Sequence, residues 1–81
     1  MGKMRILSKL GDTMVRWDER AAAAGDPDAE EAVRQAEGLF RQERASGATA
    51  FKVGDAGPAE KIETFDPEAE QIIMVPRVAG G

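Results

Sequence analysis

The sequence predicts an α+β domain in which one helix packs on a mixed sheet of four to five strands. Two observations point to this class. Segments of alternating apolar and polar residues, typical of half-buried strands, lie on both sides of one long segment, residues 27–46, in which apolar residues recur at helical spacing. A helix and a sheet that are each apolar on one side bury those sides against each other. The predicted order is strand, strand, helix, strand, short strand, strand.

The first two strands are expected to form a β-hairpin. In residues 4–10 the side chains from Met4 onward point alternately to two sides, and residues 13–17 resume the alternation after Gly11-Asp12, which is typical of a turn. Trp17, near the end of this hairpin, is most simply a core residue.

Residues 18–25 are expected to form an exposed connection. Their run of four alanines favours a helix but is too short to be stable by itself. Gly25 and Pro27 then interrupt it. The sequence therefore predicts a surface connection between the hairpin and the helix.

The main helix begins with a clear start signal. Asp26 is the expected N-cap and Pro27 the first helical residue. The helix should continue to about Ser46 and stop at Gly47, because glycine tolerates the left-handed conformation that ends many helices. The apolar stripe of this helix comprises Ala29, Ala32, Val33, Ala36, Leu39 and Phe40.

The opposite side of this helix is polar. Glu30 with Arg34, and Glu37 with Arg41, have the i,i+4 spacing of ion pairs worth a few tenths of a kcal/mol each. Gly38 lies inside the helix at a cost of about 1 kcal/mol relative to alanine. Close packing against a strand is one explanation for a glycine at this position.

Three further segments complete the predicted sheet. Residues 48–53 form a short strand, residues 61–65 a brief edge strand and residues 72–75 the last strand, with a single capped turn at residues 66–70 before it. The last strand is apolar on both faces, so it is either a central strand or a strand whose outer face binds a partner. We expect it to neighbour the first strand.

The outer face of the last strand is the expected partner-binding surface. Alternation points Ile72 and Met74 toward the helix and Ile73 and Val75 away from it. The alternative is that the long connection at residues 18–28 simply covers Ile73 and Val75. The residues expected on the partner-binding surface are Ile73, Val75, Leu7 and Met14, rimmed by Arg5, Lys9 and Arg16.

Pro76 marks the expected end of strand pairing, because proline has no N–H to donate to a sheet. We therefore expect a folded domain over residues 1–76 and a flexible diglycine tail over residues 77–81. Neither Gly80 nor Gly81 has a β-carbon, so such a tail can pass through a constriction that excludes other residues. The carboxylate of Gly81 is the predicted working group of the protein.

Composition excludes several classes of function. The chain has no cysteine and no histidine, which removes common nucleophiles, general bases and metal ligands, so we expect neither an enzyme nor a metal or cofactor site. The net charge of −4 argues against nucleic-acid binding. No window approaches a membrane span and no hydrophobic signal region begins the chain, so a soluble, cytoplasmic protein is expected.

The order of these elements resembles the ubiquitin-like β-grasp family over nearly the whole chain. Residues 4–9, Met-Arg-Ile-Leu-Ser-Lys, resemble the first strand of ubiquitin in the spacing of Met, Ile and Lys. Residues 75–81, Val-Pro-Arg-Val-Ala-Gly-Gly, are similar to the tails of bacterial sulfur-carrier proteins, which often end in Pro-Pro-Val-Ala-Gly-Gly. Arg77 stands where those carriers commonly have a second proline, and ubiquitin has an arginine at the matching distance from its end. This departure favours a protein modifier over a sulfur carrier.

The resemblance implies that the chain is a substrate of other enzymes. An E1-like adenylating enzyme, using ATP and magnesium, would activate Gly81, and an E2-like enzyme would pass it to a lysine of a target protein, from which a deconjugating protease would release it. Arg77 and Val78 would be recognised by these enzymes. In the sulfur-carrier alternative, a sulfurtransferase helps to convert the same carboxylate to a thiocarboxylate. A further alternative, from another class, is a β-grasp module that binds its partners without a covalent step.

Overall fold

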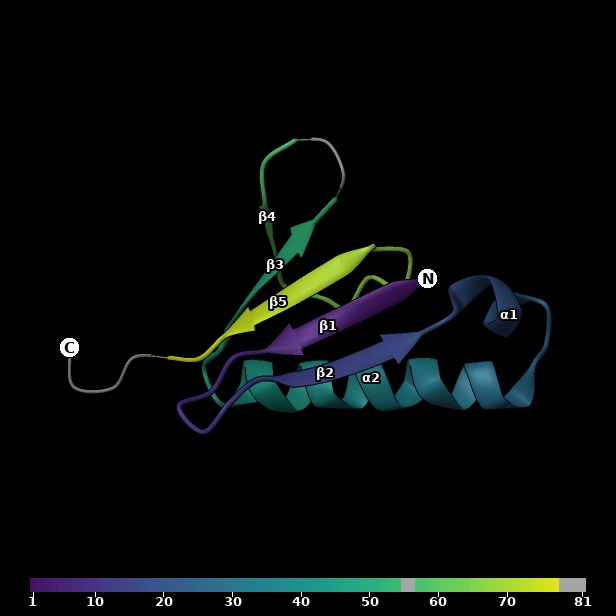
Figure 1. Ribbon diagram of the computed structural model, residues 1–81, viewed down its shortest axis with the longest axis horizontal. Helices are drawn as coiled ribbons and strands as arrows, with labels where there is room; N and C mark the ends of the chain where they lie inside the picture. The colour runs from purple at the N-terminus through teal and green to yellow at the C-terminus, as the bar shows by residue number, and fades with distance from the viewer. Residues whose placement is uncertain (55–56, 78–81) are drawn as a thin grey trace.

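Five strands form a mixed sheet in the order β2-β1-β5-β3-β4 (Figure 1). The computed structural model describes residues 1–54 and 57–77. β1 and β5 run parallel, and the other neighbouring pairs are antiparallel. The last strand is therefore central, which is one of the two interpretations of its apolar sequence, and it lies beside the first strand, as expected. The strands are β1 (Gly2–Ile6), β2 (Thr13–Trp17), β3 (Thr49–Val53), β4 (Glu60–Ile62) and β5 (Gln71–Val75).

The main helix, α2 (Pro27–Ala45), packs on one face of this sheet, which confirms the predicted α+β class (Figure 1). Asp26 is its N-cap, as predicted: the Oδ1 atom accepts the N–H groups of Asp28 (3.0 Å) and Ala29 (3.4 Å). Gly47, with φ of +99°, follows the helix in the left-handed region and ends it. Among the described residues, no helix is long and apolar enough to cross a membrane.

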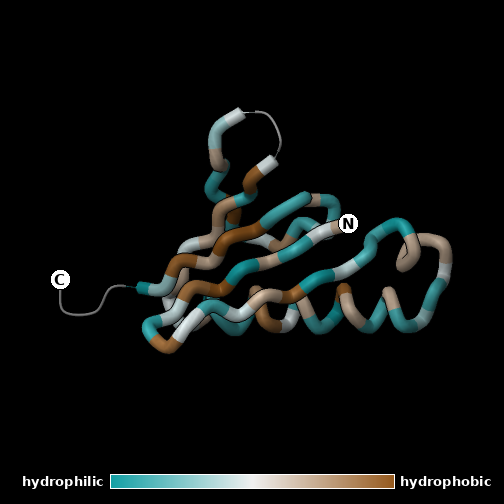
Figure 2. The backbone as a smooth tube through the Cα atoms, in the orientation of Figure 1, coloured by the Kyte–Doolittle hydropathy of each residue, from teal (hydrophilic) through white to brown (hydrophobic). Residues whose placement is uncertain are grey.

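The core lies between α2 and the sheet. Met4 and Ile6 of β1, and Ile72 and Met74 of β5, point toward the helix and are buried, in agreement with the predicted alternation. Trp17 is only 2% exposed, which confirms it as a core residue. Figure 2 shows hydrophobic residues concentrated along the central strand. The other buried apolar residues are Ala36, Phe40, Ala48, Ala50 and Ala69.

Trp17 connects the hairpin to the segment before β5. Its indole N–H donates to the carbonyl oxygen of Pro67 at 2.8 Å. Its ring centroid lies 5.1 Å from that of Phe65, which in turn packs edge-on to Phe40 at 5.8 Å. Gly2 leaves the space that the indole fills, because a β-carbon there would lie 2.3 Å from Trp17 Cε2.

The prediction of a strand over residues 4–10 is wrong at its C-terminal end, because β1 ends at Ile6. Ser8 accepts two hydrogen bonds from the residues that follow it. Its Oγ atom accepts the N–H of Leu10 at 3.1 Å, and the Ser8 carbonyl oxygen accepts the N–H of Gly11 at 3.2 Å. These short-range bonds form a turn where the alternating pattern predicts a strand. Leu10 is fully exposed as a result and does not contribute to the core.

The predicted connection at residues 18–25 contains a short helix, α1 (Glu19–Ala23). Asp18 caps it, because its Oδ1 atom accepts the N–H groups of Arg20 (3.2 Å) and Ala21 (3.1 Å). The helix also packs against α2. Capping and tertiary packing together stabilise a segment that is too short to be helical alone.

The predicted strand over residues 61–65 is also too long. β4 ends before Phe65, which turns inward and joins the aromatic cluster of the core. The turn that follows is confirmed. The Oδ1 atom of Asp66 accepts the N–H of Glu68 at 3.0 Å, and its carbonyl oxygen accepts the N–H of Ala69 at 3.1 Å.

The ion pairs on the exposed side of α2 agree with the prediction in one case of two. Arg41 pairs with Glu37 at 3.1 Å, as expected. Arg34 pairs with Glu31 at 2.7 Å, three residues away, and not with Glu30. Both spacings place the partners on neighbouring turns of the same helix face.

Gly38 is not packed against a strand. In residues 1–54 and 57–77, no atom outside the local helix lies within 4 Å of the position that a β-carbon would occupy. The proposed explanation for this glycine is therefore wrong, and nothing in the structure requires the absence of a side chain at this position.

Candidate functional site

The sheet face turned away from α2, here called the open face, carries most of the residues that were predicted to bind a partner. Strand alternation places Ile73 and Val75 of β5 on it, together with Met14 of β2. α1 packs against α2, so this part of the long connection does not lie over the open face (Figure 1). The strand residues of the open face are Lys3, Arg5, Met14, Arg16, Thr49, Phe51, Val53, Lys61, Gln71, Ile73 and Val75.

One row of side chains crosses all five strands on the open face. Arg5 is paired with Met14 on one side and with Ile73 on the other. Ile73 is paired with Phe51, and Phe51 with Lys61. Ile73 and Phe51 form a half-buried apolar centre between two cations. Met14 is 37% exposed and is separated from this centre by Arg5, so the predicted apolar patch is not continuous.

Phe51 belongs to the candidate site, although the sequence analysis did not name it. Its neighbour Ala50 is buried against α2, and Phe51 therefore faces the opposite side of β3. The alternation of side-chain direction along residues 48–53 could have shown from the sequence that Phe51 faces outward. The strand order was also needed, because only the pairing of β3 with β5 places Phe51 beside Ile73.

Val75 and Leu7 extend the apolar surface toward the point where the chain leaves the sheet. Val75 is paired with Thr49 of β3. The N–H of Leu7 donates to the carbonyl oxygen of Met74 at 3.1 Å, which continues the β1–β5 pairing by one residue. The structure therefore brings Leu7 and Val75 to the same end of the sheet, and both are half-buried.

Arg77 lies against the turn that ends α2. A β-carbon on Gly47 would be 3.0 Å from Arg77 Cδ and 3.4 Å from Arg77 Cβ, so the aliphatic part of Arg77 packs directly over this glycine. The last carbonyl groups of a helix carry partial negative charge, which favours a cation nearby. The end of α2 thus positions the first residue that follows Pro76.

An apolar hollow of about 820 Å³ lies beside Arg77 and is here called the tail-exit hollow. It is bounded by the turn between β1 and β2, by the C-terminal half of α2 and by the end of β5. Leu10, at 100% exposure, stands on its rim. Leu7 and Leu39, which are half-buried, continue this apolar lining, and an apolar surface patch around a hollow is typical of a protein-binding site. The lining residues are Ile6, Leu7, Ser8, Lys9, Leu10, Thr13, Leu39, Glu43, Pro76 and Arg77.

The remaining predicted site residues lie outside the residues that the structure describes. These are Val78, Gly80 and Gly81. The prediction of a flexible tail over residues 77–81 and that of a working carboxylate on Gly81 stay predictions.

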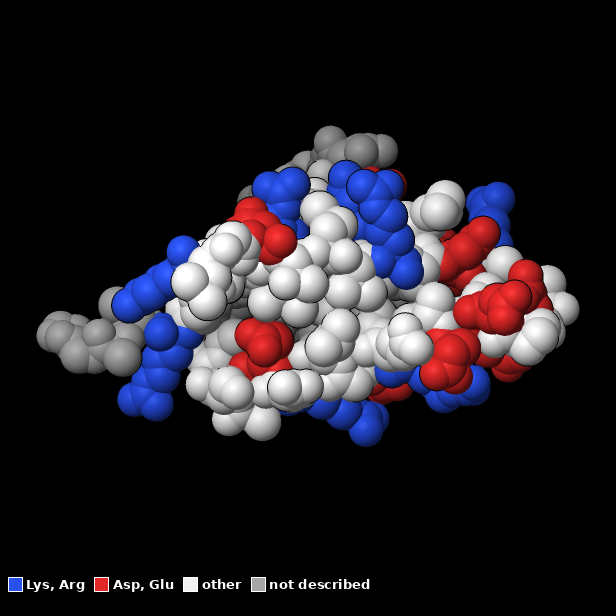
Figure 3. All heavy atoms as spheres, turned by 60° about the horizontal axis from the view of Figure 1, so that its bottom comes forward, with Lys and Arg blue, Asp and Glu red and all other residues white. Residues whose placement is uncertain are grey.

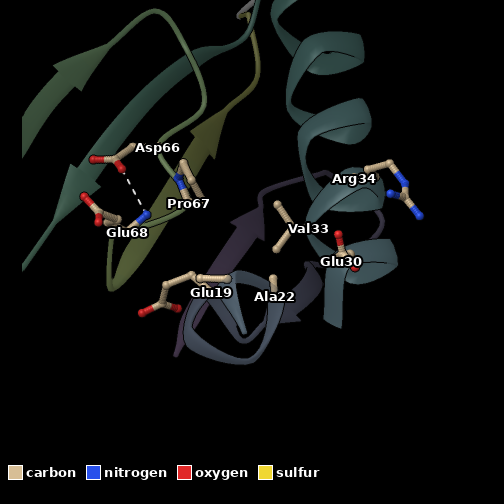
Figure 4. Close-up of a pocket in the computed structure, with 9 residues that line it drawn as sticks. Glu19, Ala22, Glu30, Val33, Arg34, Asp66, Pro67 and Glu68 are labelled. Carbon is tan, nitrogen blue, oxygen red and sulfur yellow. Dashed lines mark hydrogen bonds between the residues drawn. The ribbon is translucent and has the colours of Figure 1, made fainter. Parts of the chain in front are cut away.

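Acidic side chains gather at the other end of the molecule. Figure 3 shows them over the end formed by α1 and the first turns of α2. A second hollow, of about 520 Å³, lies there between the two helices and the turn before β5 (Figure 4). Val33 and Ala22 form part of its apolar floor, and Glu19, Glu30 and Glu68 lie around them. None of the predicted site residues lines this hollow, so it is separate from the candidate site.

The described residues provide surfaces for docking. Among them, no group of three His, Cys, Asp or Glu side chains is arranged to hold a metal ion. What the geometry does provide is an apolar and basic sheet face and an apolar hollow, both next to Arg77. Such an arrangement can hold another protein beside the last described residue of the chain.

Comparison with family models, with curated proteins and with solved structures found no significant match for this chain.

Proposed function

We propose that this chain is a ubiquitin-like β-grasp protein whose Gly81 carboxylate is activated by an E1-like enzyme and transferred to a lysine of a target protein. The observation that carries the proposal is where the chain leaves the fold. The central strand ends at Val75, and Pro76 and Arg77 follow beside both the open face and the tail-exit hollow. Residues 78–81 span at most about 13 Å when extended, so an enzyme docked on either surface can reach Gly81.

The topology supports the β-grasp part of the proposal. Two antiparallel strands are followed by one main helix, and the last strand returns to pair in parallel with the first. The chain departs from the simplest form of this order in one element, α1, which lies between β2 and α2. Because α1 packs at the acidic end, it leaves the surfaces near Arg77 unchanged.

The proposed chemistry takes place at Gly81 and is performed by partner enzymes. A carboxylate oxygen attacks the α-phosphorus of magnesium-bound ATP, which forms an acyl-adenylate and releases pyrophosphate. A cysteine thiolate of the partner displaces AMP and forms a thioester. The amine of a target lysine then displaces the thiol and loses a proton, which leaves an isopeptide bond. The contribution of this chain is to position the carboxylate.

Arg77 is the residue that we assign to recognition by the activating enzyme. It lines the tail-exit hollow two residues after Val75 of the open face, and its stem packs on Gly47. Because the stem of Arg77 packs on the folded domain, an enzyme that binds its guanidinium group also places the residues that follow Arg77. The apolar contacts come from Ile73, Val75 and Leu7.

The test is mass spectrometry of the protein and its conjugates from the native cell. Trypsin cleaves after Arg77, so each modified lysine should carry a branched Val-Ala-Gly-Gly remnant. The proposal also requires Gly81 to be the last residue of the mature chain, which the intact mass measures. A mature chain that extends beyond Gly81 would contradict it.

Matched variants separate the transfer step from docking. Deletion of Gly80 and Gly81 should abolish conjugates and leave non-covalent enzyme binding intact. Arg77→Ala should weaken activation, whereas Arg20→Ala, which removes an exposed cation on α1, should not.

Two other outcomes would support the alternative functions. An intact mass in which sulfur replaces one oxygen at Gly81, without lysine remnants, would support a sulfur carrier. Partner binding with neither product would support a non-covalent module.

A further inference from the structure

Three cations lie together on the open face at the β1–β2 edge of the sheet. Lys3 on β1 is directly opposite Arg16 on β2, and Arg5 follows Lys3 on the same face of β1. All three side chains are exposed. Like charges in directly opposite positions of two strands destabilise the pairing. Lys3 and Arg16 therefore form an unfavourable cross-strand pair.

In the described part of the chain, none of these three cations forms an ion pair. The ion pairs of the described residues involve other basic groups. Glu70 lines a shallow hollow with Lys3 and Arg16 without forming an ion pair with either. The strand positions of the open face contain no carboxylate among the residues that the structure describes, although the whole chain carries a net charge of −4.

We propose that the Lys3–Arg5–Arg16 cluster docks an acidic segment of a partner protein. Carboxylates on the partner would remove the repulsion between Lys3 and Arg16, so binding would relieve a cost that the free protein bears. Apolar side chains of the same segment would contact Met14 and Ile73, which lie on either side of Arg5. The docked segment is therefore acidic with interspersed apolar residues.

A protein fits this surface better than nucleic acid does. The cluster has three cations and no aromatic side chain of its own, and Phe51, which lies beyond Ile73 on the open face, is half-buried, so the face offers little surface on which bases could stack. The net charge of −4 repels a polyanion as a whole. A short acidic segment, by contrast, needs only the local charge. This docking does not require the activation of Gly81.

The test uses a capped synthetic peptide of alternating aspartate and leucine, titrated into the full ¹⁵N-labelled chain. We expect amide shifts at Lys3, Arg5, Met14, Arg16 and Ile73. The matched peptide with serine in place of aspartate should bind at least about tenfold more weakly. Salt of about 1 M, where the screening length is roughly 3 Å, should remove most of the affinity.

The Arg16→Glu variant distinguishes a docking role of Arg16 from a role in the stability of the fold. This variant should lose at least about tenfold in peptide affinity and should also melt at a higher temperature, because it replaces a repulsive pair with Lys3 by an attractive one. Lys61→Glu, on the same face at the other edge of the sheet, should change the affinity by less than about threefold. Deletion of Gly80 and Gly81 should not change it, which separates this proposal from the proposed function.

Several outcomes would overturn the proposal. The first is that the serine peptide binds as tightly as the aspartate peptide. The second is that Arg16→Glu keeps its peptide affinity or melts at a lower temperature than the wild type. The third is that a single-stranded oligonucleotide binds more tightly than the acidic peptide. Sedimentation that shows a second copy of the chain on this face, lost in Arg16→Glu, would identify a different occupant.

Discussion

Gly2 and Trp17 show how a single missing β-carbon shapes the core. The indole lies over Gly2, donates to Pro67 at 2.8 Å and contacts Phe65. One residue thereby holds β2 to the segment that leads into β5. The backbone conformation of Gly2 is not the reason for a glycine here, because its φ is not in the left-handed region. The reason is space.

Gly2→Ala should destabilise the protein by about 1–3 kcal/mol, because the new methyl group would overlap the indole and force Trp17 away from Pro67. Urea unfolding measures the loss of stability, and tryptophan fluorescence reports the displaced ring. Gly54→Ala is the matched control, since no atom of the described residues lies within 4 Å of its β-carbon position and its φ is not positive. Equal stabilities of the two variants would contradict the assigned role of Gly2.

Lys52 of β3 pairs with two carboxylates, one on β4 and one in the turn before β5. Its Nζ atom lies 3.2 Å from Asp66 Oδ2 and 3.8 Å from Glu60 Oε2. The hydrogen bond to Asp66, the charge of Asp66 and the charge of Glu60 together raise the pKa of Lys52 above its ordinary value of 10.5. These interactions stabilise the fold fully at pH values from neutral up to the ordinary pKa of Lys52, where the side chain is protonated in both the folded and the unfolded chain.

The contribution of Lys52 should be constant from neutral pH up to about pH 10.5 and should disappear as the pH rises through the raised pKa of the folded state. Lys52→Met is expected to be less stable than the wild type at neutral pH, and this difference should shrink above pH 10.5. Lys52→Arg should keep the pairing with the two carboxylates above pH 10.5, because arginine stays charged. Urea unfolding at a series of pH values measures all three proteins. A wild-type advantage over Lys52→Met that persists at higher pH would contradict the assignment.

At the scale of the elements, local signals decided where α2 begins and ends. Asp26 and Pro27 start it, and Gly47 stops it, as the sequence predicts. The same local reasoning failed for α1 and for the end of β1. α1 depends on packing against α2, and β1 ends early because Ser8 forms a turn. Short elements depend on contacts that a sequence window does not contain.

Asp26→Ala should cost about 1 kcal/mol, because it leaves the N–H groups of Asp28 and Ala29 without their acceptor. Asp26→Ser is the control and should keep most of the stability, since serine also accepts these bonds. Thermal or urea unfolding followed by circular dichroism measures both variants. Equal losses in the two would show that the side-chain charge matters and the cap does not.

Gly38→Ala should stabilise the protein by about 0.5–1 kcal/mol. The helix gains a residue with better intrinsic propensity, and no atom outside the local helix lies within 4 Å of the new methyl group. Urea unfolding measures the gain. A loss of stability would mean that this face of α2 is in contact with something in solution.

At the scale of the whole molecule, the sheet separates a core from a docking surface. Neighbouring residues of β5 belong to different sides: Ile72 is fully buried under α2, whereas Ile73 is half-buried on the open face. β5 is the central strand, and its outer face is apolar and only partly buried. The chain then leaves the sheet beside Arg77, at the end where the tail-exit hollow lies.

Ile72→Ala should lose about 2–5 kcal/mol, because it opens a cavity in the core. Ile73→Ala should lose less, about 1–2 kcal/mol, because this side chain is only partly buried on the open face. Urea unfolding of the two variants tests this difference directly. A comparable loss in Ile73→Ala would mean that the open face is covered in solution.

The candidate site was predictable from the sequence in part. The alternation of residues 72–75 correctly assigned Ile73 and Val75 to the outer face and Ile72 and Met74 to the core. It did not show that Phe51 lies beside Ile73, nor that Arg5 separates Ile73 from Met14. Side-chain direction along a strand is a local property, whereas the neighbours across a sheet depend on strand order.

The sequence by itself determined the class of fold, the main helix with its caps and the inward or outward direction of most strand residues, because periodicity and capping act within a few residues. The tertiary structure alone decided which residues meet. It placed β5 between β1 and β3, set Lys3 opposite Arg16 and laid Arg77 over Gly47. These contacts join segments far apart in the chain, and they exist only when the burial of one shared core brings those segments together.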